Sequence, residues 1–325
     1  MLIVAAILWG LGFVAQRDGM NYIGPFFYTA IRFGIGVLCL LPVYFMTRKL
    51  EPKIEVKVKA EAETEAEAEA EVKTGTDNIK GHESIVERKT VIFAGLIVGI
   101  FLFLGVSAQQ IGLQTTTAGK ASFITALYMV LVPVFGIALG HKTTKSVWIS
   151  IIVALVGLYF MSISKDFNIE KGDIFVIACA ILWAIHFLFI AHYSSRVGAI
   201  RLSIIQFTVC MVLSLIVAII SEPSPLLSQS PTLPLPFISA LPSILYGGIG
   251  AVGIAYTLHV VALKDANPAY ASLILSTESV FGALGGWLIL HETMTSRQIL
   301  GAGLILAAVL FSQIKFRKRT KAQNI

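Results

Sequence analysis

The chain has 325 residues, of which 56% are hydrophobic and only 14% are charged, and its formal net charge is +6. A soluble domain has about 45–50% apolar and about 25% charged residues. The apolar residues also fall in blocks of about 20, the length that crosses a hydrocarbon core of ~30 Å. The composition therefore excludes a soluble globular protein and predicts an all-α membrane protein.

Ten apolar segments follow one another along the chain, separated by stretches rich in Pro, Gly or charge. The first has no basic residues before it and no convincing cleavage site, so we interpret it as a helix rather than a signal peptide. We expect ten transmembrane helices at about residues 1–16, 25–46, 91–111, 117–140, 145–163, 173–193, 200–220, 238–263, 268–290 and 296–315.

A low-complexity segment rich in Glu, Lys and Ala lies between the second and third spans, at about residues 50–80. Glu recurs at every second position from Glu61 to Glu71, a spacing that fits neither a helical stripe nor a buried strand. We interpret the segment as a solvated, disordered cytoplasmic loop. A tolerated insertion and a docking or regulatory segment are both compatible with this composition.

The distribution of Lys and Arg predicts the orientation of the chain in the membrane. One set of alternate loops, with the C-terminal tail, holds 19 basic residues, whereas the opposite loops hold Arg17, Lys165, Lys171 and Arg297. By the positive-inside rule both termini are cytoplasmic, and we expect a multi-pass protein of the bacterial cytoplasmic membrane. The basic tail at 317–325 fits contact with anionic lipid rather than with nucleic acid.

The two halves of the chain are similar to each other. "AAILWGLGFV" (5–14) resembles "CAILWAIHFL" (179–188) at a shift of 174 residues. At a shift of 150, nine of the 29 positions from 121 to 149 are identical to their counterparts. The difference between the shifts is close to the size of the Glu-rich segment.

We therefore expect two five-helix repeats, at 1–165 and 172–316. Because five is odd, the second copy enters the membrane from the opposite side, which gives inverted repeats. This architecture is typical of secondary transporters, whose substrate site lies near the midplane between the halves.

Several segments look like one known family: "LWGLGFVAQR" in the first span, "IRF" in the second, "AQQIGLQTTTAGKASFITALYMVLVPVFG" over the third and fourth, and "ILSTESVFGALGGWLILHE" in the ninth. With the repeats, they resemble the EamA-type permeases of the drug/metabolite transporter superfamily over almost all of the chain outside 47–90. The resemblance implies ten helices, alternating access and a small metabolite or drug as substrate. The chain departs from many relatives at His291 and Glu292, where they have Gly-Glu.

Glu278 is the acidic residue nearest the middle of a predicted span, where a charge costs ~2.5–3.5 kcal/mol on insertion scales. Its helical neighbours Ala271, Gly282 and Gly285 are small, which marks a helix contact or a cavity wall rather than a lipid face. We expect Glu278 to bind a cationic or polar substrate group or a coupling proton. The alternative is a permanent pair with Lys120 or Arg32.

Two basic residues also lie within predicted spans. Arg32 is too deep in the second span for easy escape to the interface, so we expect it to bind an anion or to pair with Glu278. Lys120 lies near the outer end of the fourth span, where its side chain could also snorkel to the interface.

The remaining site candidates are found by their repeat positions. Tyr128 is the counterpart of Glu278 and could hydrogen-bond to it or to substrate, or only pack. Trp9 and Trp183 are counterparts that could form a wall for flat or cationic ligands, or pack as core aromatics. Gln109 and His259 are counterparts as well; a buried histidine can relay protons or be a satisfied core residue.

Other chemistry is not indicated by the sequence. The six histidines have no metal-binding spacing, no Walker A motif is present, and no nucleophile–base pair appears. We therefore expect no metal, no cofactor and no enzymatic activity. We predict a secondary transporter of a small organic molecule, with proton coupling as a further hypothesis. The alternatives are an uncoupled facilitator or exchanger, and a membrane sensor or assembly subunit.

Overall fold

The structure, a computed structural model, describes residues 1–47, 76–116, 118–162, 170–222, 236–289 and 294–312. These ranges are helical and contain no strand. The elements are α1 (Leu2–Gly19), α2 (Pro25–Thr47), α3 (Thr76–Gly112), α4 (Ala118–Ala126), α5 (Tyr128–Ala138), α6 (Lys145–Ser162), α7 (Lys171–Val197), α8 (Ala199–Ser221), α9 (Pro236–Leu245), the π-helix η1 (Tyr246–Tyr256), α10 (Thr257–Leu263), α11 (Pro268–Leu275), α12 (Glu278–Ile289) and α13 (Ser296–Ser312).

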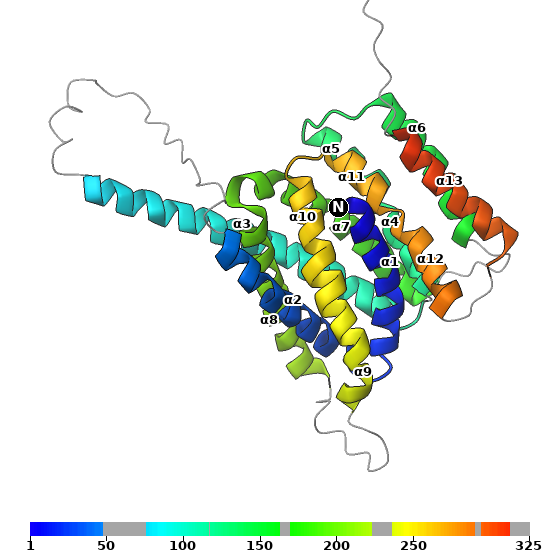
Figure 1. Ribbon diagram of the computed structural model, residues 1–325, viewed down its shortest axis with the longest axis horizontal. Coiled ribbons are helices and arrows are strands. Elements are labelled where there is room, and N and C mark those ends of the chain that lie inside the picture. Colours follow the sequence, from blue (N-terminus) through cyan, green and yellow to red (C-terminus); the bar gives the residue numbers. More distant parts are fainter. Residues whose placement is uncertain (48–75, 117, 163–169, 223–235, 290–293, 313–325) are drawn as a thin grey trace, which may run out of the picture.

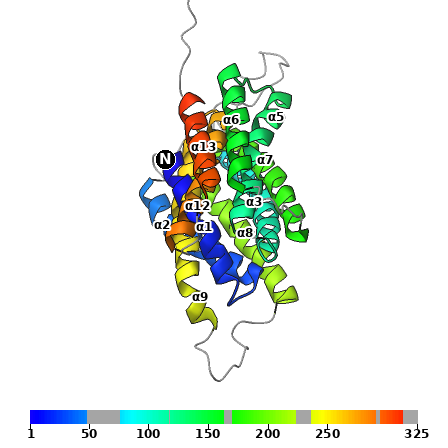
Figure 2. The same cartoon turned by 90° about the vertical axis from the view of Figure 1, so that its right-hand side faces the viewer.

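The helices pack into one bundle, in which α6 and α13 lie side by side as a pair (Figures 1 and 2). Among the described residues, eight candidate membrane spans are long and apolar enough to cross a bilayer, and α6 and α13 contribute two shorter apolar helices. Exposed Leu, Ile, Val and Phe side chains are numerous on the surface of the bundle, as expected where lipid rather than water is the solvent. The prediction of an all-α membrane protein is therefore confirmed.

The third span begins earlier than the sequence suggested. Helix α3 starts at Thr76, within the segment that we expected to be a loop. Lys, Glu and Arg are good helix formers, so a helix that is anchored in the apolar span can continue into a polar sequence. The rest of the Glu-rich segment, His291, Glu292 and the basic tail lie outside the described residues.

Two spans are interrupted at equivalent positions. The fourth breaks at Leu127, between α4 and α5, and the ninth breaks at Ser276 and Thr277, between α11 and α12. At each break a backbone amide bonds to the carbonyl three residues earlier, at 3.2 Å from Leu127 and 3.2 Å from Thr277. These are tight 3₁₀-like turns. As a result Tyr128 and Glu278 are the first residues of α5 and α12.

The eighth span contains the π-helical stretch η1, "YGGIGAVGIAY". A π-helix is rare and is frequently found at functional sites. Three of its glycines make close contacts: Gly247 packs on Tyr28, Gly248 on Ile35, and Gly253 on Cys39. The stretch therefore lies directly against α2, with which it shares an extensive interface.

Close backbone contacts also join α1 to α12. A Cβ atom on Gly10 would stand 2.5 Å from the carbonyl oxygen of Glu278 and 2.7 Å from the amide nitrogen of Gly282. Such small residues allow helices to approach closely in membranes. The contact holds α1 against the break that precedes Glu278.

Candidate functional site

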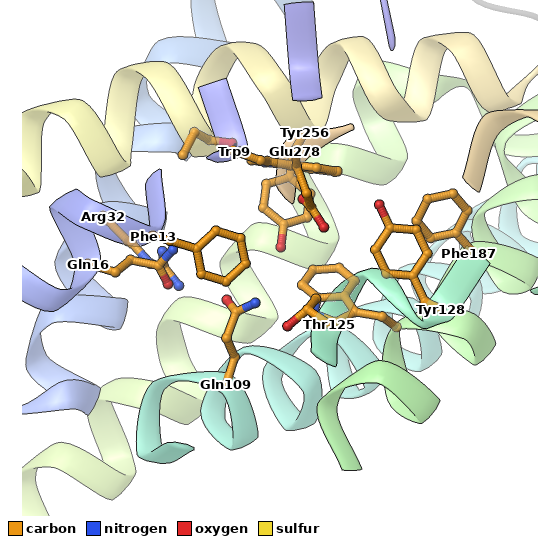
Figure 3. A pocket seen from close by; sticks show the side chains of 12 residues that line it. Trp9, Phe13, Gln16, Arg32, Gln109, Thr125, Tyr128, Phe187, Tyr256 and Glu278 are labelled. Atoms are coloured by element: carbon orange, nitrogen blue, oxygen red, sulfur yellow. Dashed lines mark hydrogen bonds between the residues drawn. The ribbon is translucent and has the colours of Figure 1, made fainter. Parts of the chain in front are cut away.

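A small cavity lies at the centre of the bundle, where helices from both halves of the chain meet (Figure 3). Its volume is about 40 Å³, room for about three or four water molecules at roughly 10–15 Å³ each. It combines polar and charged groups with a largely aromatic wall. The lining residues are Trp9, Phe13, Gln16, Arg32, Gln109, Thr125, Tyr128, Trp183, Phe187, Ala251, Tyr256 and Glu278.

Six of the eight site candidates from the sequence line this cavity: Trp9, Arg32, Gln109, Tyr128, Trp183 and Glu278. His259 and Lys120 do not. The sequence reasoning did not single out Phe13 and Gln16, although they follow Trp9 at four and seven residues and so share its helical face. It also missed Thr125, one turn before Tyr128.

Glu278 is only 3% exposed. Its carboxylate and the Tyr128 hydroxyl point toward one another across the cavity (Figure 3). Within the described ranges Oε1 of Glu278 has no hydrogen-bond partner, and Glu278 forms no ion pair with Arg32 or Lys120. An uncompensated negative charge is costly in such a place. The geometry therefore suits a group that binds a cation or a proton, not one end of a permanent ion pair.

Arg32 is also 3% exposed and enters the cavity from α2. Its guanidinium carbon lies 5.4 Å from the centre of the Tyr28 ring and 5.3 Å from the centre of the Phe33 ring, within cation–π range. Its Nε has no hydrogen-bond partner among the described residues. In Figure 3 Arg32 and Gln16 are on one side of the Phe13 ring, and Glu278 is on the other.

An aromatic cluster lines the cavity between these polar groups. The ring centroids of Trp9 and Tyr256 are 4.7 Å apart, those of Trp183 and Tyr256 are 5.6 Å apart, and those of Trp9 and Trp183 are 6.3 Å apart. Nε1 of Trp9 donates a hydrogen bond to the carbonyl of Ala251 at 3.1 Å. This bond ties α1 to the π-helix and fixes the indole in the cavity wall.

His259 is fully buried behind this wall. Its ring centroid lies 5.2 Å from that of Trp9 and 4.3 Å from that of Phe187, and neither ring nitrogen has a hydrogen-bond partner in the described ranges. A nearby buried histidine, His186, bonds to Gln206 at 2.9 Å. His259 is thus a neighbour of the cavity rather than part of its surface.

Lys120 has a partner that the sequence reasoning did not foresee. Its Nζ forms an ion pair with Asp173 at 2.5 Å, in place of the expected snorkelling or pairing with Glu278. Asp173 is 2% exposed and also accepts hydrogen bonds from the Thr116 hydroxyl at 2.7 Å and the Glu170 amide at 2.8 Å. Acidic residues three apart at a helix start, Glu170 and Asp173, are a capping-box pattern and were the available signal.

Candidate membrane spans around a cavity that is lined by charged, polar and aromatic side chains define a multi-pass helical membrane protein with a central site. The model of the EamA-like transporter family matches residues 1–60, 78–163 and 170–313. The chain therefore belongs to the EamA-like transporter family and is a membrane transporter, and the resemblance seen in its sequence is confirmed.

Individual relatives agree with this assignment. The chain is 27% identical over 315 residues to an uncharacterized transporter from Archaeoglobus fulgidus, a match that covers 97% of this chain and 85% of the relative. It is 23% identical over 323 residues to the uncharacterized transporter YoaV of Bacillus subtilis, covering 98% and 97% of the two chains. It is 24% identical over 242 residues to the threonine/homoserine exporter RhtA of Escherichia coli, covering 74% and 76%.

One solved structure, described as the crystal structure of a protein, superposes with a TM-score of 0.69. The superposition covers 96% of this chain and 95% of that chain, at 16% sequence identity. At this identity the likeness concerns the fold.

Proposed function

We propose that this protein is a secondary transporter that moves a small organic molecule through the central cavity by alternating access. The observation that carries the proposal is the cavity itself: a buried carboxylate, a buried guanidinium and an aromatic wall are assembled from both halves of the chain. In a membrane protein, ionisable groups that face an internal cavity mark a substrate or ion pathway. The multi-pass topology with both termini in the cytoplasm of a bacterial cell is part of the same proposal.

The pattern of helix contacts supports two inverted repeats of five helices. The repeat pairs α1 with α7, α2 with α8, α3 with the α9–η1–α10 span, α4–α5 with α11–α12, and α6 with α13. Helix α1 packs against η1 and α12, and α7 packs against α3, α4 and α5. Helix α2 packs against α8, and α6 packs against α13. The contacts of α1 with η1 and α12 thus have their counterparts in those of α7 with α3, α4 and α5, as a pseudo-two-fold axis requires. The interruptions at Leu127 and Thr277 are also 150 residues apart, the same shift that relates the two halves of the sequence.

Three acidic side chains join the halves at the end of the bundle where α1 ends and α2 begins. Asp18 accepts a hydrogen bond from the Ser243 hydroxyl at 2.6 Å. Glu222 accepts bonds from the amides of Phe26 and Phe27, at 2.7 and 2.9 Å. Asp173 pairs with Lys120 as described above. We call these contacts the acidic clasps.

At the opposite end, exposed hydroxyls of Thr144 and Tyr270 lie 3.0 Å apart. Access to the cavity from the first end therefore requires the acidic clasps to separate, whereas access from the other end leaves them intact. Because the contacts differ between the two ends of the bundle, one end can open while the other stays closed, as alternating access requires.

Glu278 is the group that we propose to couple transport to protons. It is buried, it faces the cavity, and within the described ranges it has no basic partner to hold its charge. A thermal-shift screen across amino acids, nucleobases, sugars and cationic drugs supplies a tracer. Flux of this tracer into proteoliposomes is then measured with and without a pH gradient. The proposal expects faster flux with the gradient, and loss of that dependence in Glu278→Gln.

An uncoupled facilitator or exchanger is the alternative within transport, and flux independent of the gradient in both proteins would establish it. A membrane sensor or assembly subunit is the alternative outside transport. Deletion of residues 51–75 separates the two classes. A transporter keeps its flux after the deletion, whereas a protein that acts by docking through this segment loses its phenotype.

A further inference from the structure

We propose that the substrate of this site is a small zwitterion, whose ammonium group binds at Glu278 and whose carboxylate binds at Arg32. The inference rests on the proposed transport function and names the chemical class of the molecule that is carried. It follows from the charges of the cavity, their separation and the character of the surface between them.

The charged side chains that line the cavity favour a ligand with one charge of each sign. Arg32 and Glu278 line one cavity, each is 3% exposed, and in the described part of the chain they do not pair with each other or with another charged group. A buried charge whose partner is missing is strongly unfavourable. A cationic ligand would compensate only Glu278, and an anionic ligand only Arg32. A zwitterion compensates both and leaves the net charge of the site unchanged.

The two charged side chains lie apart from each other in the cavity. Figure 3 shows Arg32 and Gln16 on one side of the Phe13 ring, and Glu278 and Tyr128 on the other side. The charges are thus presented at separate ends of the cavity and not side by side. A single molecule can reach both only if its own charges are at opposite ends.

The two ends of the cavity also differ in the groups that they can bind. A guanidinium is permanently charged, and its planar set of N–H donors matches a carboxylate. Glu278 offers only acceptors to an ammonium group when ionised. The aromatic faces of Trp9, Trp183 and Tyr256 lie in the same lining and favour a cation nearby. The site therefore has an anion-binding end and a cation-binding end, joined by an apolar and aromatic middle.

The test compares matched ligands that differ by one charge. The purified full chain in detergent is heated with γ-aminobutyrate, butylamine or butyrate, and with glycine, methylamine or acetate. Hydrogen bonds to charged groups are strong enough that we expect removal of one charged group to weaken binding by about tenfold or more. At least one zwitterion should stabilise the protein, at concentrations at least about tenfold lower than its own amine or acid. This comparison uses the unmodified protein and does not depend on the folding of a variant.

Two variants then test which end of the cavity binds the ammonium group and which binds the carboxylate. Glu278→Gln should bind the zwitterion no better than the matching acid, because the ammonium group has lost its partner. Arg32→Gln should bind it no better than the matching amine. Asp265→Asn and Arg17→Gln make the same kinds of change at exposed positions, and both should keep the preference for the zwitterion.

The inference is overturned if a ligand with one charge stabilises the protein as well as its zwitterion does. It is also overturned if zwitterions with one to five methylene groups between their charges give no stabilisation, or if both cavity variants weaken all three matched ligands equally. Transport of the tracer is measured separately from ligand binding. Transport of a tracer that is not a zwitterion would contradict the zwitterion inference but would support the proposed transport function. Zwitterion binding without flux would count against transport alone.

Discussion

Replacement of Gly10 by Ala should separate α1 from α12 at the point where Glu278 enters the cavity. The new Cβ would lie 2.5 Å from the Glu278 carbonyl oxygen and 2.7 Å from the Gly282 amide nitrogen. Both atoms belong to the backbone, so the helices must move apart by roughly 1 Å to restore an ordinary contact distance. Overpacking of this kind costs about 1–3 kcal/mol.

Gly12→Ala is a matched control on the same helix, because its Cβ would lie 3.8 Å from the Cβ of Ala251, an ordinary contact. Both changes gain the same helix propensity, about 0.8–1 kcal/mol. Gly10→Ala should therefore unfold with a free energy about 1–3 kcal/mol lower than that of Gly12→Ala. Denaturation by SDS in mixed micelles, followed by circular dichroism, measures this difference. Equal stability of the two variants would refute the reasoning.

The same titration checks three further expectations. Lys120→Met leaves Asp173 buried without its cation and should cost about 3–5 kcal/mol, and adding Asp173→Leu should recover much of this; an equal loss in the double variant would contradict the assigned ion pair. Glu222→Ala removes the acceptor for two amides at the start of α2 and should cost about 0.5–2 kcal/mol, so an unchanged midpoint would argue against the cap. Trp9→Phe deletes the hydrogen bond to Ala251 and should lower the free energy of unfolding by about 0.5–1.5 kcal/mol. An unaltered free energy would contradict a stabilising role of this bond.

The membrane-spanning character could be predicted from the sequence because it depends on blocks of apolar residues, which are a local property. The interruptions at Leu127 and Thr277 could not. A turn of one or two residues leaves the hydropathy of a span unchanged, and neither break contains Gly or Pro. At the ninth-span break the hydroxyls of Ser276 and Thr277 bond to the carbonyls three residues earlier, and such bonds can bend a helix without marking it in the hydropathy.

For the candidate site, sequence gives the depth of a residue in the membrane but not the direction in which its side chain points. Depth and the repeat were enough to select Glu278 and Tyr128, which both line the cavity. Gln109 lines it too, but its counterpart His259 lies behind Trp9, since the π-helical stretch that precedes it changes which residues face inward.

The partner of Lys120 was missed for a related reason. Asp173 belongs to a different helix in the other half of the chain, and sequence distance carries no information about that contact. Only the capping pattern with Glu170 marked it as a residue with a defined position.

The π-helical stretch from Tyr246 to Tyr256 has a mechanical consequence. A π-turn holds about one more residue than an α-turn. Relaxation of this segment toward ordinary α geometry would therefore rotate α10 about the helix axis relative to α9. Tyr256 would be swung around the helix axis, and Trp9, tethered to the carbonyl of Ala251, would be pulled with it. Rotation within the eighth span would thus move one wall of the cavity.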